Sequence, residues 1–93
     1  MKILQARPFE RVFKKLHASL QREVESAIRE IISNPLIGDL KIQDIHGLRV
    51  YKFRMNKQLT LLAYQYDEPA DTLVLETVGP RENFYRDLKK AKE

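Results

Sequence analysis

Several residue types that carry chemistry are scarce or missing in this chain. Its 93 residues include no cysteine, no tryptophan, two histidines and three glycines. Without cysteine there is no disulfide, no iron–sulfur cluster and no thiolate metal site. The glycines, at positions 38, 47 and 79, are scattered, so the sequence contains no glycine-rich loop for a nucleotide phosphate.

Two further routes to catalysis find no support in the residues present. His17 and His46 have no carboxylates near them in a ligand pattern, so we expect neither a metal nor a cofactor. The three serines at positions 19, 26 and 33 all fall on one expected helix or its ends, which does not favour a serine nucleophile.

Long hydrophobic runs are also absent. The longest apolar runs extend over only a few residues, so we expect no membrane-spanning segment. The apolar stretch within the first five residues is too short for a signal peptide, and polar residues follow it too early. This favours a cytoplasmic location. With 43% hydrophobic residues, the chain is expected to form a single domain over residues 1–93 with no second core.

The composition has an excess of basic over acidic residues. Seventeen lysines and arginines outnumber 13 acidic residues, which gives a net charge of +4. This balance leans towards anionic partners such as nucleic acid or an acidic protein segment.

The first half of the chain predicts one strand and two helices. The strand covers residues 2–6. Apolar residues at helical spacing predict a helix over residues 8–16, and a longer helix with Ser19 as its N-cap that ends at Asn34-Pro35. We expect these two amphipathic helices to form an antiparallel hairpin laid over a sheet.

The second half predicts strands and a last helix. Residues 36–46 are less regular and fit either a short strand or a packed loop. Strands are predicted over 47–56, 59–66 and 72–78, joined by tight turns, and a helix over 82–92. The order β-α-α-β-β-β-α predicts an α+β fold with a four-stranded, mostly antiparallel sheet packed by the N-terminal helical hairpin.

The strand over residues 47–56 is the most informative stretch. Its alternation places Tyr51 and Phe53 on one face and Lys52 and Arg54 on the other. Cations on a rigid strand are well placed to hold a phosphate. The alternative interpretation is that they form the solvated side of a half-covered sheet.

More basic residues accompany this strand. Lys41, Arg49 and Lys57 lie close to it in sequence, and Arg81 and Arg86 follow the last strand. Such a set can cleave RNA without a metal: a base takes the 2′-hydroxyl proton, cations stabilise the charge on the phosphate, and an acid protonates the 5′-oxygen. Only RNA offers the 2′-hydroxyl.

Three segments, residues 47–54, 61–67 and 78–85, together with the order of elements, resemble the RelE/ParE superfamily of bacterial toxins from type II toxin–antitoxin systems. The resemblance covers nearly the whole chain. It implies a toxin held in a hetero-oligomer by a cognate antitoxin. Members of the RelE branch cut mRNA on the ribosome, whereas members of the ParE branch share the fold and poison DNA gyrase.

The RelE branch implies roles for four residues. Lys52 and Arg54 match strand cations that hold the scissile phosphate and serve in proton transfer. Arg81 matches an arginine that stabilises the transition state. Tyr85 falls near an aromatic residue that stacks on a substrate base, at a different offset from the arginine.

One position departs from this branch. Leu61 lies on the strand where the RelE pattern has an arginine. Either Lys57 or Arg49 substitutes for it, or the protein cuts RNA poorly, or it acts on another target. Our leading hypothesis is a ribosome-dependent mRNA endoribonuclease. The alternatives are a non-enzymatic inhibitor of gyrase and a basic domain whose only ligand is the antitoxin.

Overall fold

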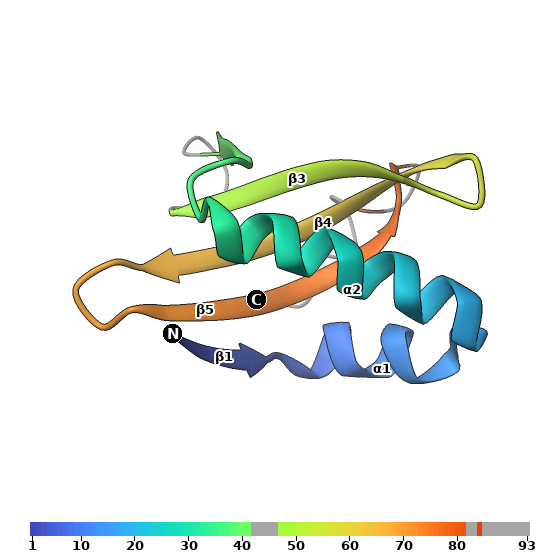
Figure 1. Cartoon of the computed structure of the whole chain (residues 1–93), viewed down its shortest axis with the longest axis horizontal. Coiled ribbons are helices and arrows are strands. Elements are labelled where there is room, and N and C mark those ends of the chain that lie inside the picture. Colours follow the sequence, from blue (N-terminus) through green and yellow to red (C-terminus); the bar gives the residue numbers. More distant parts are fainter. Residues whose placement is uncertain (42–46, 82–83, 85–93) are drawn as a thin grey trace.

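A computed structural model describes residues 1–41, 47–81 and 84 (Figure 1). The described part contains two helices and one five-stranded sheet with the strand order β1-β5-β4-β3-β2. The elements are β1 Lys2–Gln5, α1 Arg7–Lys15, α2 Ala18–Ser33, β2 Asp39–Lys41, β3 Leu48–Met55, β4 Gln58–Asp67 and β5 Thr72–Pro80. The predicted α+β class is confirmed.

The predicted number of four strands is wrong, because a short fifth strand extends the sheet. β2 runs antiparallel to the start of β3, with Asp39 opposite Val50 and Lys41 opposite Leu48. Its three residues are too few to show alternation in the sequence. The other pairings are antiparallel, except that β1 lies parallel to β5.

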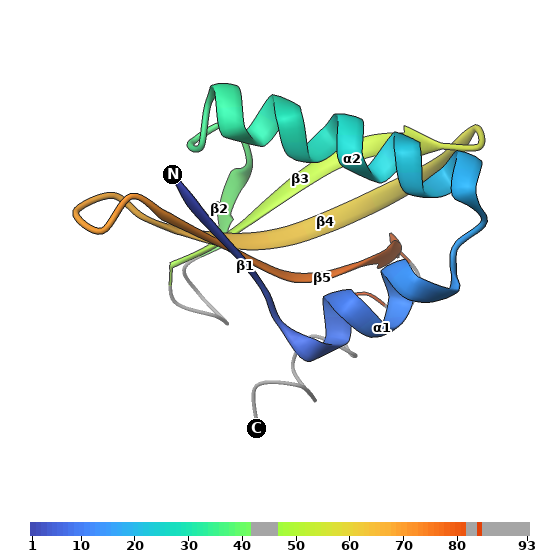
Figure 2. The same cartoon turned by 60° about the horizontal axis from the view of Figure 1, so that its bottom comes forward.

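The two helices run in opposite directions, as predicted (Figures 1 and 2). The Gln21 side chain on α2 donates a hydrogen bond to the carbonyl of Phe13 on α1 (2.9 Å), which ties them together. The predicted N-cap Ser19 is wrong: α2 begins at Ala18, and the ring nitrogen of His17 accepts a hydrogen bond from the Ser19 N–H (3.2 Å). An imidazole nitrogen can satisfy a first-turn N–H as a serine oxygen does.

Hydrophobic side chains pack on both faces of the sheet. On the helix face, the buried cluster joins both helices to β4 and β5; it contains Phe9, Val24, Ala27, Ile31, Leu62, Tyr64, Leu73, Leu75 and Val78. On the opposite face, a smaller cluster contains Leu48, Val50, Leu61, Ala63 and Phe84. β4 supplies alternate residues to the two clusters, as a strand covered on both faces must.

The turn between β3 and β4 confirms the predicted hairpin. Asn56 and Lys57 both have positive φ, 52° and 66°. This is the two-residue type I′ turn, whose twist matches that of the flanking strands. Of the helix predicted over 82–92, the structure describes only residue 84, so this helix stays a prediction. Neither described helix is long and apolar enough to cross a membrane.

Candidate functional site

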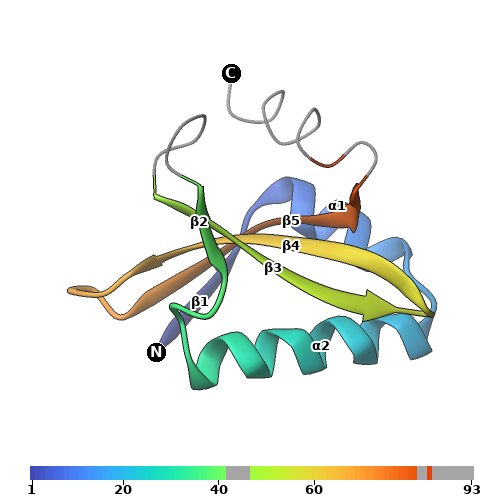
Figure 3. The same ribbon diagram turned by 90° about the horizontal axis from the view of Figure 1, so that it is seen from above.

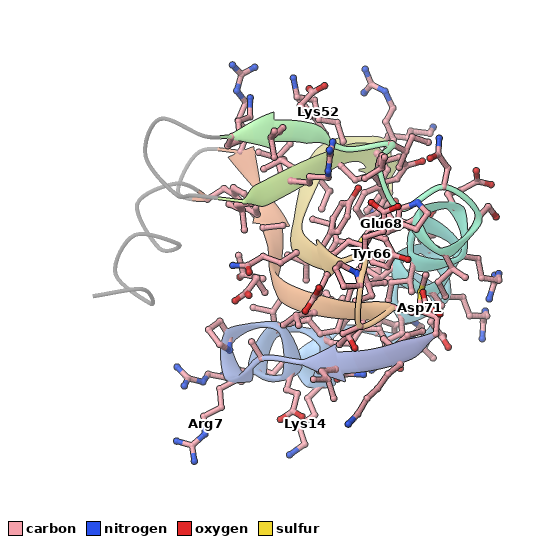
Figure 4. All side chains as sticks on the ribbon, turned by 90° about the vertical axis from the view of Figure 1, so that its left-hand side faces the viewer. Arg7, Lys14, Lys52, Tyr66, Glu68 and Asp71 are labelled. Atoms are coloured by element: carbon pink, nitrogen blue, oxygen red, sulfur yellow. The ribbon has the colours of Figure 1, made fainter. Side chains whose placement is uncertain are left out.

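β3 places its cations as the alternation predicts. Tyr51 and Phe53 pack against the helix-face core, whereas Val50 belongs to the opposite cluster. Lys52 and Arg54 therefore project from the opposite face, and both are exposed. Figure 4 shows Lys52 pointing out from the sheet at one end of the molecule, with Arg7 and Lys14 of α1 at the other end.

Lys52 has an acidic neighbour that the sequence analysis did not single out. Its Nζ lies 3.9 Å from Oδ2 of Asp39 on β2, and both side chains are largely exposed. Lys41, two residues further along β2, shares the face of Asp39. An exposed ion pair of this length contributes little stability, so it leaves Lys52 available to another anion.

Arg54 is held at the end of the same strand. Its Nη1 donates a hydrogen bond to the carbonyl of Lys57 in the turn (3.3 Å), so the turn orients the guanidinium. The side chain of Lys57 is exposed. A guanidinium has five N–H donors in one plane, so this single hydrogen bond leaves donors that could bind a phosphate.

Arg81 follows β5 at the same end of the sheet. Pro80, the last residue of β5, lies opposite Thr60. Arg81 follows it outside the strand, so it begins near the level of Leu59, whose partner on β3 is Arg54. Two strand spacings, about 10 Å, separate β5 from β3. A nucleotide backbone is long enough to contact both strands.

Leu61 lies on β4, between β3 and β5, and belongs to the core. It is opposite Lys52 on one side and Gly79 on the other, with 1% of its surface exposed. It packs in the cluster that contains Phe84. The position that carries a cation in the RelE pattern is here part of an apolar floor.

Arg49 is not brought to this face. Its Nη1 donates hydrogen bonds to the carbonyls of Leu36 (3.1 Å) and Gly38 (2.9 Å) in the loop before β2. The same loop is held by the Tyr64 hydroxyl, which accepts from the Gly38 N–H (2.9 Å) and donates to the Pro35 carbonyl (2.8 Å). Burial raises the pKa of Tyr64, so the hydroxyl stays protonated and keeps both bonds.

Two predicted residues, Tyr85 and Arg86, lie outside the described residues. Within residues 1–41, 47–81 and 84, no three histidine or acidic side chains lie close enough together to hold a metal ion. The fold and this face define a small α+β domain with two cations on β3 and a third, Arg81, directly after β5, beside buried apolar residues of β4.

The sequence matches the family model of the ParE-like toxins of type II bacterial toxin–antitoxin systems over residues 3–89. The chain therefore belongs to this family, which confirms the superfamily resemblance. Comparison with the curated proteins gives no match.

Solved structures of RelE toxins share the fold. A double mutant of E. coli RelE in the free state has a TM-score of 0.74 at 16% identity, over 98% of this chain and 94% of that one. The toxin in the E. coli RelBE toxin–antitoxin complex has a TM-score of 0.69 at 17% identity, over 87% of this chain and 96% of that one. A RelBE complex from Mycobacterium tuberculosis gives a TM-score of 0.65 at 22% identity, over 86% of this chain and 96% of that one.

Proposed function

We propose that this toxin is a single-domain, ribosome-dependent endoribonuclease that cuts mRNA in the cytoplasm by metal-free acid–base chemistry. The observation that carries the proposal is the position of three cations relative to the sheet. Lys52 and Arg54 project from one face of β3, and Arg81 directly follows β5, beginning near the level of Arg54.

The proposed reaction is a transesterification. The 2′-oxygen loses its proton to a base and bonds to phosphorus, while the bond from phosphorus to the 5′-oxygen breaks and that oxygen takes a proton from an acid. Lys52 and Arg54 bind the phosphate and Lys52 serves in proton transfer, while Arg81 stabilises the extra negative charge of the pentavalent state. Tyr85 stacks on a neighbouring base.

The other basic residues divide into two groups. We assign binding of the RNA backbone to Lys41 and Lys57, which flank the proposed site, and to Arg86. Arg49 supports the site indirectly, since its guanidinium holds the loop that leads into β2 and Asp39. The ribosome would position the substrate, which lessens the need for a strong general base in the toxin.

The proposal includes a protein partner. Two of the structures named above, the RelBE structures from E. coli and M. tuberculosis, are toxin–antitoxin complexes. We propose that this chain likewise forms a hetero-oligomer with a cognate antitoxin. The net charge of +4 favours an acidic antitoxin segment.

The test is primer extension on a reporter mRNA in a purified translation system. The wild-type protein should produce cuts inside translated codons. Lys52→Ala combined with Arg81→Ala should reduce cleavage at least a hundredfold, because two phosphate-binding charges are lost. The matched control is Arg7→Ala with Lys14→Ala, which removes the same charges at the other end of the molecule and should leave cleavage unchanged (Figure 4).

A second function, inhibition of DNA gyrase, is favoured by one observation. Leu61 occupies the core at the position where the RelE pattern has an arginine. Intact mRNA together with growth arrest in cells would replace the nuclease proposal with this one. A gyrase supercoiling assay would then show inhibition that survives the Lys52→Ala/Arg81→Ala substitution.

A further inference from the structure

β3 has an open edge over its second half. β2 pairs only with residues 48–50 of β3, whereas β4 pairs with the whole strand. No other described strand pairs with residues 51–55 on the side away from β4, although α2 runs alongside β3 (Figure 3). An open strand edge is a template for another extended chain.

The turn determines which backbone groups point to this edge. In a two-residue type I′ hairpin, the flanking residues Met55 and Gln58 exchange both backbone hydrogen bonds. Hydrogen-bonded and non-bonded pairs then alternate along the ladder. Lys52 and Arg54 belong to the non-bonded pairs, so their N–H and C=O groups point away from β4, to the open edge.

The edge is limited at both ends by features of the chain. At one end β2 occupies it as far as Val50. At the other end the next outward N–H, that of Asn56, donates a hydrogen bond to the Glu23 carboxylate on α2 (3.1 Å). The stretch between spans five residues, about 17 Å of strand.

A cleft lies beside this edge, between α2 and β3. Its volume is about 280 Å³, and its lining comprises Glu23, Ser26, Ala27 and Glu30 of α2 and Tyr51, Phe53 and Arg54 of β3. The two rings are stacked with centroids 6.1 Å apart and are half-buried. Both glutamates are exposed at the rim.

The two sides of the edge call for opposite charges. Aromatic faces between two carboxylates favour an arginine or lysine side chain. On the other face of the strand, Lys52 favours a carboxylate, and so does Arg54, which also lines the cleft. An extended segment presents alternate residues to the two sides, so one segment with alternating acidic and apolar or basic residues satisfies both.

The geometry points to the open edge of β3 as the docking site for one extended segment of the antitoxin, about five residues long. The segment places an arginine or lysine over Tyr51 and Phe53 beside Glu30, and acidic residues beside Lys52 and Arg54. The inference rests on the proposed function for the source of the segment. Its docking also covers two of the proposed phosphate-binding cations.

A second copy of this chain fits the edge poorly. Two β3 edges paired antiparallel would bring the Lys52 and Arg54 side chains of one copy close to those of the other on the same face. Like charges opposite each other across strands are destabilising. The cations therefore select against self-pairing and for an acidic partner.

The experiment is a nuclear magnetic resonance titration of the isotope-labelled protein with two synthetic nine-residue peptides. Both peptides alternate acidic with apolar residues. The central residue, which is designed to face Tyr51 and Phe53, is arginine in one peptide and glutamate in the other. We expect the arginine peptide to shift the amide signals of Lys52 and Arg54 and to leave those of β1, at the opposite edge of the sheet, unchanged.

A charge swap tests the cleft itself. Glu30→Arg should weaken binding of the arginine peptide about five- to tenfold and strengthen binding of the glutamate peptide. Glu10→Arg, an equal change on the exposed side of α1, should alter neither. Equal binding of both peptides to the wild type and to Glu30→Arg, amide shifts confined to β1, or no shift at millimolar peptide would each overturn the inference.

The outcome is independent of the nuclease proposal, because the titration measures no cleavage. If the inference alone fails, wild-type cleavage persists while the peptides show no preference. If the nuclease proposal alone fails, mRNA stays intact while the charge swap behaves as expected.

Discussion

At the scale of single residues, the loop between α2 and β2 depends on one close approach. A Cβ on Gly38 would lie 2.8 Å from the Tyr64 hydroxyl and 3.1 Å from the Val50 backbone. Both atoms belong to the packed sheet and cannot move aside cheaply. Glycine is required here by space, whereas the φ of Gly47, 75°, is a matter of backbone conformation.

Gly38→Ala should therefore lower the free energy of unfolding by roughly 1–3 kcal/mol. Tyr64→Phe should cost a similar roughly 1–3 kcal/mol, because the buried Gly38 N–H loses its acceptor. Urea denaturation followed by circular dichroism measures both. Gly79→Ala is the control, since an added Cβ there meets nothing within 4 Å; an equal loss in all three variants would contradict this account.

At the scale of elements, the β3–β4 hairpin carries a local strain. Lys57 has φ 66°, a left-handed conformation that L-residues with a Cβ adopt at a cost. The type I′ turn requires positive φ at this position, and it sets the register that places Lys52 opposite Leu61 and Arg54 opposite Leu59. The turn therefore determines the geometry of the proposed phosphate site.

Lys57→Gly should raise the free energy of unfolding by about 0.5–1 kcal/mol, since glycine adopts this φ without strain. Thermal unfolding would show a higher midpoint. Gln58→Gly, one residue further and inside β4, should instead lower the midpoint. Glycine there relieves no strain and only increases the conformational entropy of the unfolded chain. A lower midpoint for Lys57→Gly would show that the positive φ is not costly here.

At the scale of the whole molecule, the N-terminus is tied to the far hairpin. The Asp71 carboxylate accepts a hydrogen bond from the Tyr66 hydroxyl (2.8 Å) and lies 3.3 Å from the α-amino group of Met1 (Figure 4). The hydrogen bond from Tyr66, followed by the contact with the N-terminus, lowers the pKa of Asp71 below 3.8. This contact helps to keep β1 parallel to β5, beside which it begins.

The lowered pKa predicts a dependence of stability on pH. The unfolded chain binds the Asp71 proton at a higher pH than the folded protein does, so stability rises with pH in this range. The contribution is complete only well above the ordinary pKa of 3.8, and it is lost as the pH falls through the folded pKa. Asp71→Asn should flatten the fall in unfolding midpoint below pH 4; an unchanged acid profile would contradict the assignment.

Much of the architecture was predictable because it depends on local patterns. Apolar residues at helical spacing determined α1 and α2, and alternation determined the two faces of β3. The register of a hairpin follows from a two-residue turn, so the placement of Lys52 and Arg54 could be predicted as well. The N-cap of α2 could not, because histidine is an uncommon cap.

Only the tertiary structure decided the contacts between distant segments. β2 is too short to be recognised, yet it brings Asp39 to Lys52. Arg49 and Lys52 are both basic residues of the same strand, but they lie on opposite faces of the sheet. Arg49 donates hydrogen bonds to the loop that follows α2, whereas Lys52 is exposed beside Asp39. Composition and periodicity determine which residues are buried; which polar groups meet depends on long-range register, and only packing sets it.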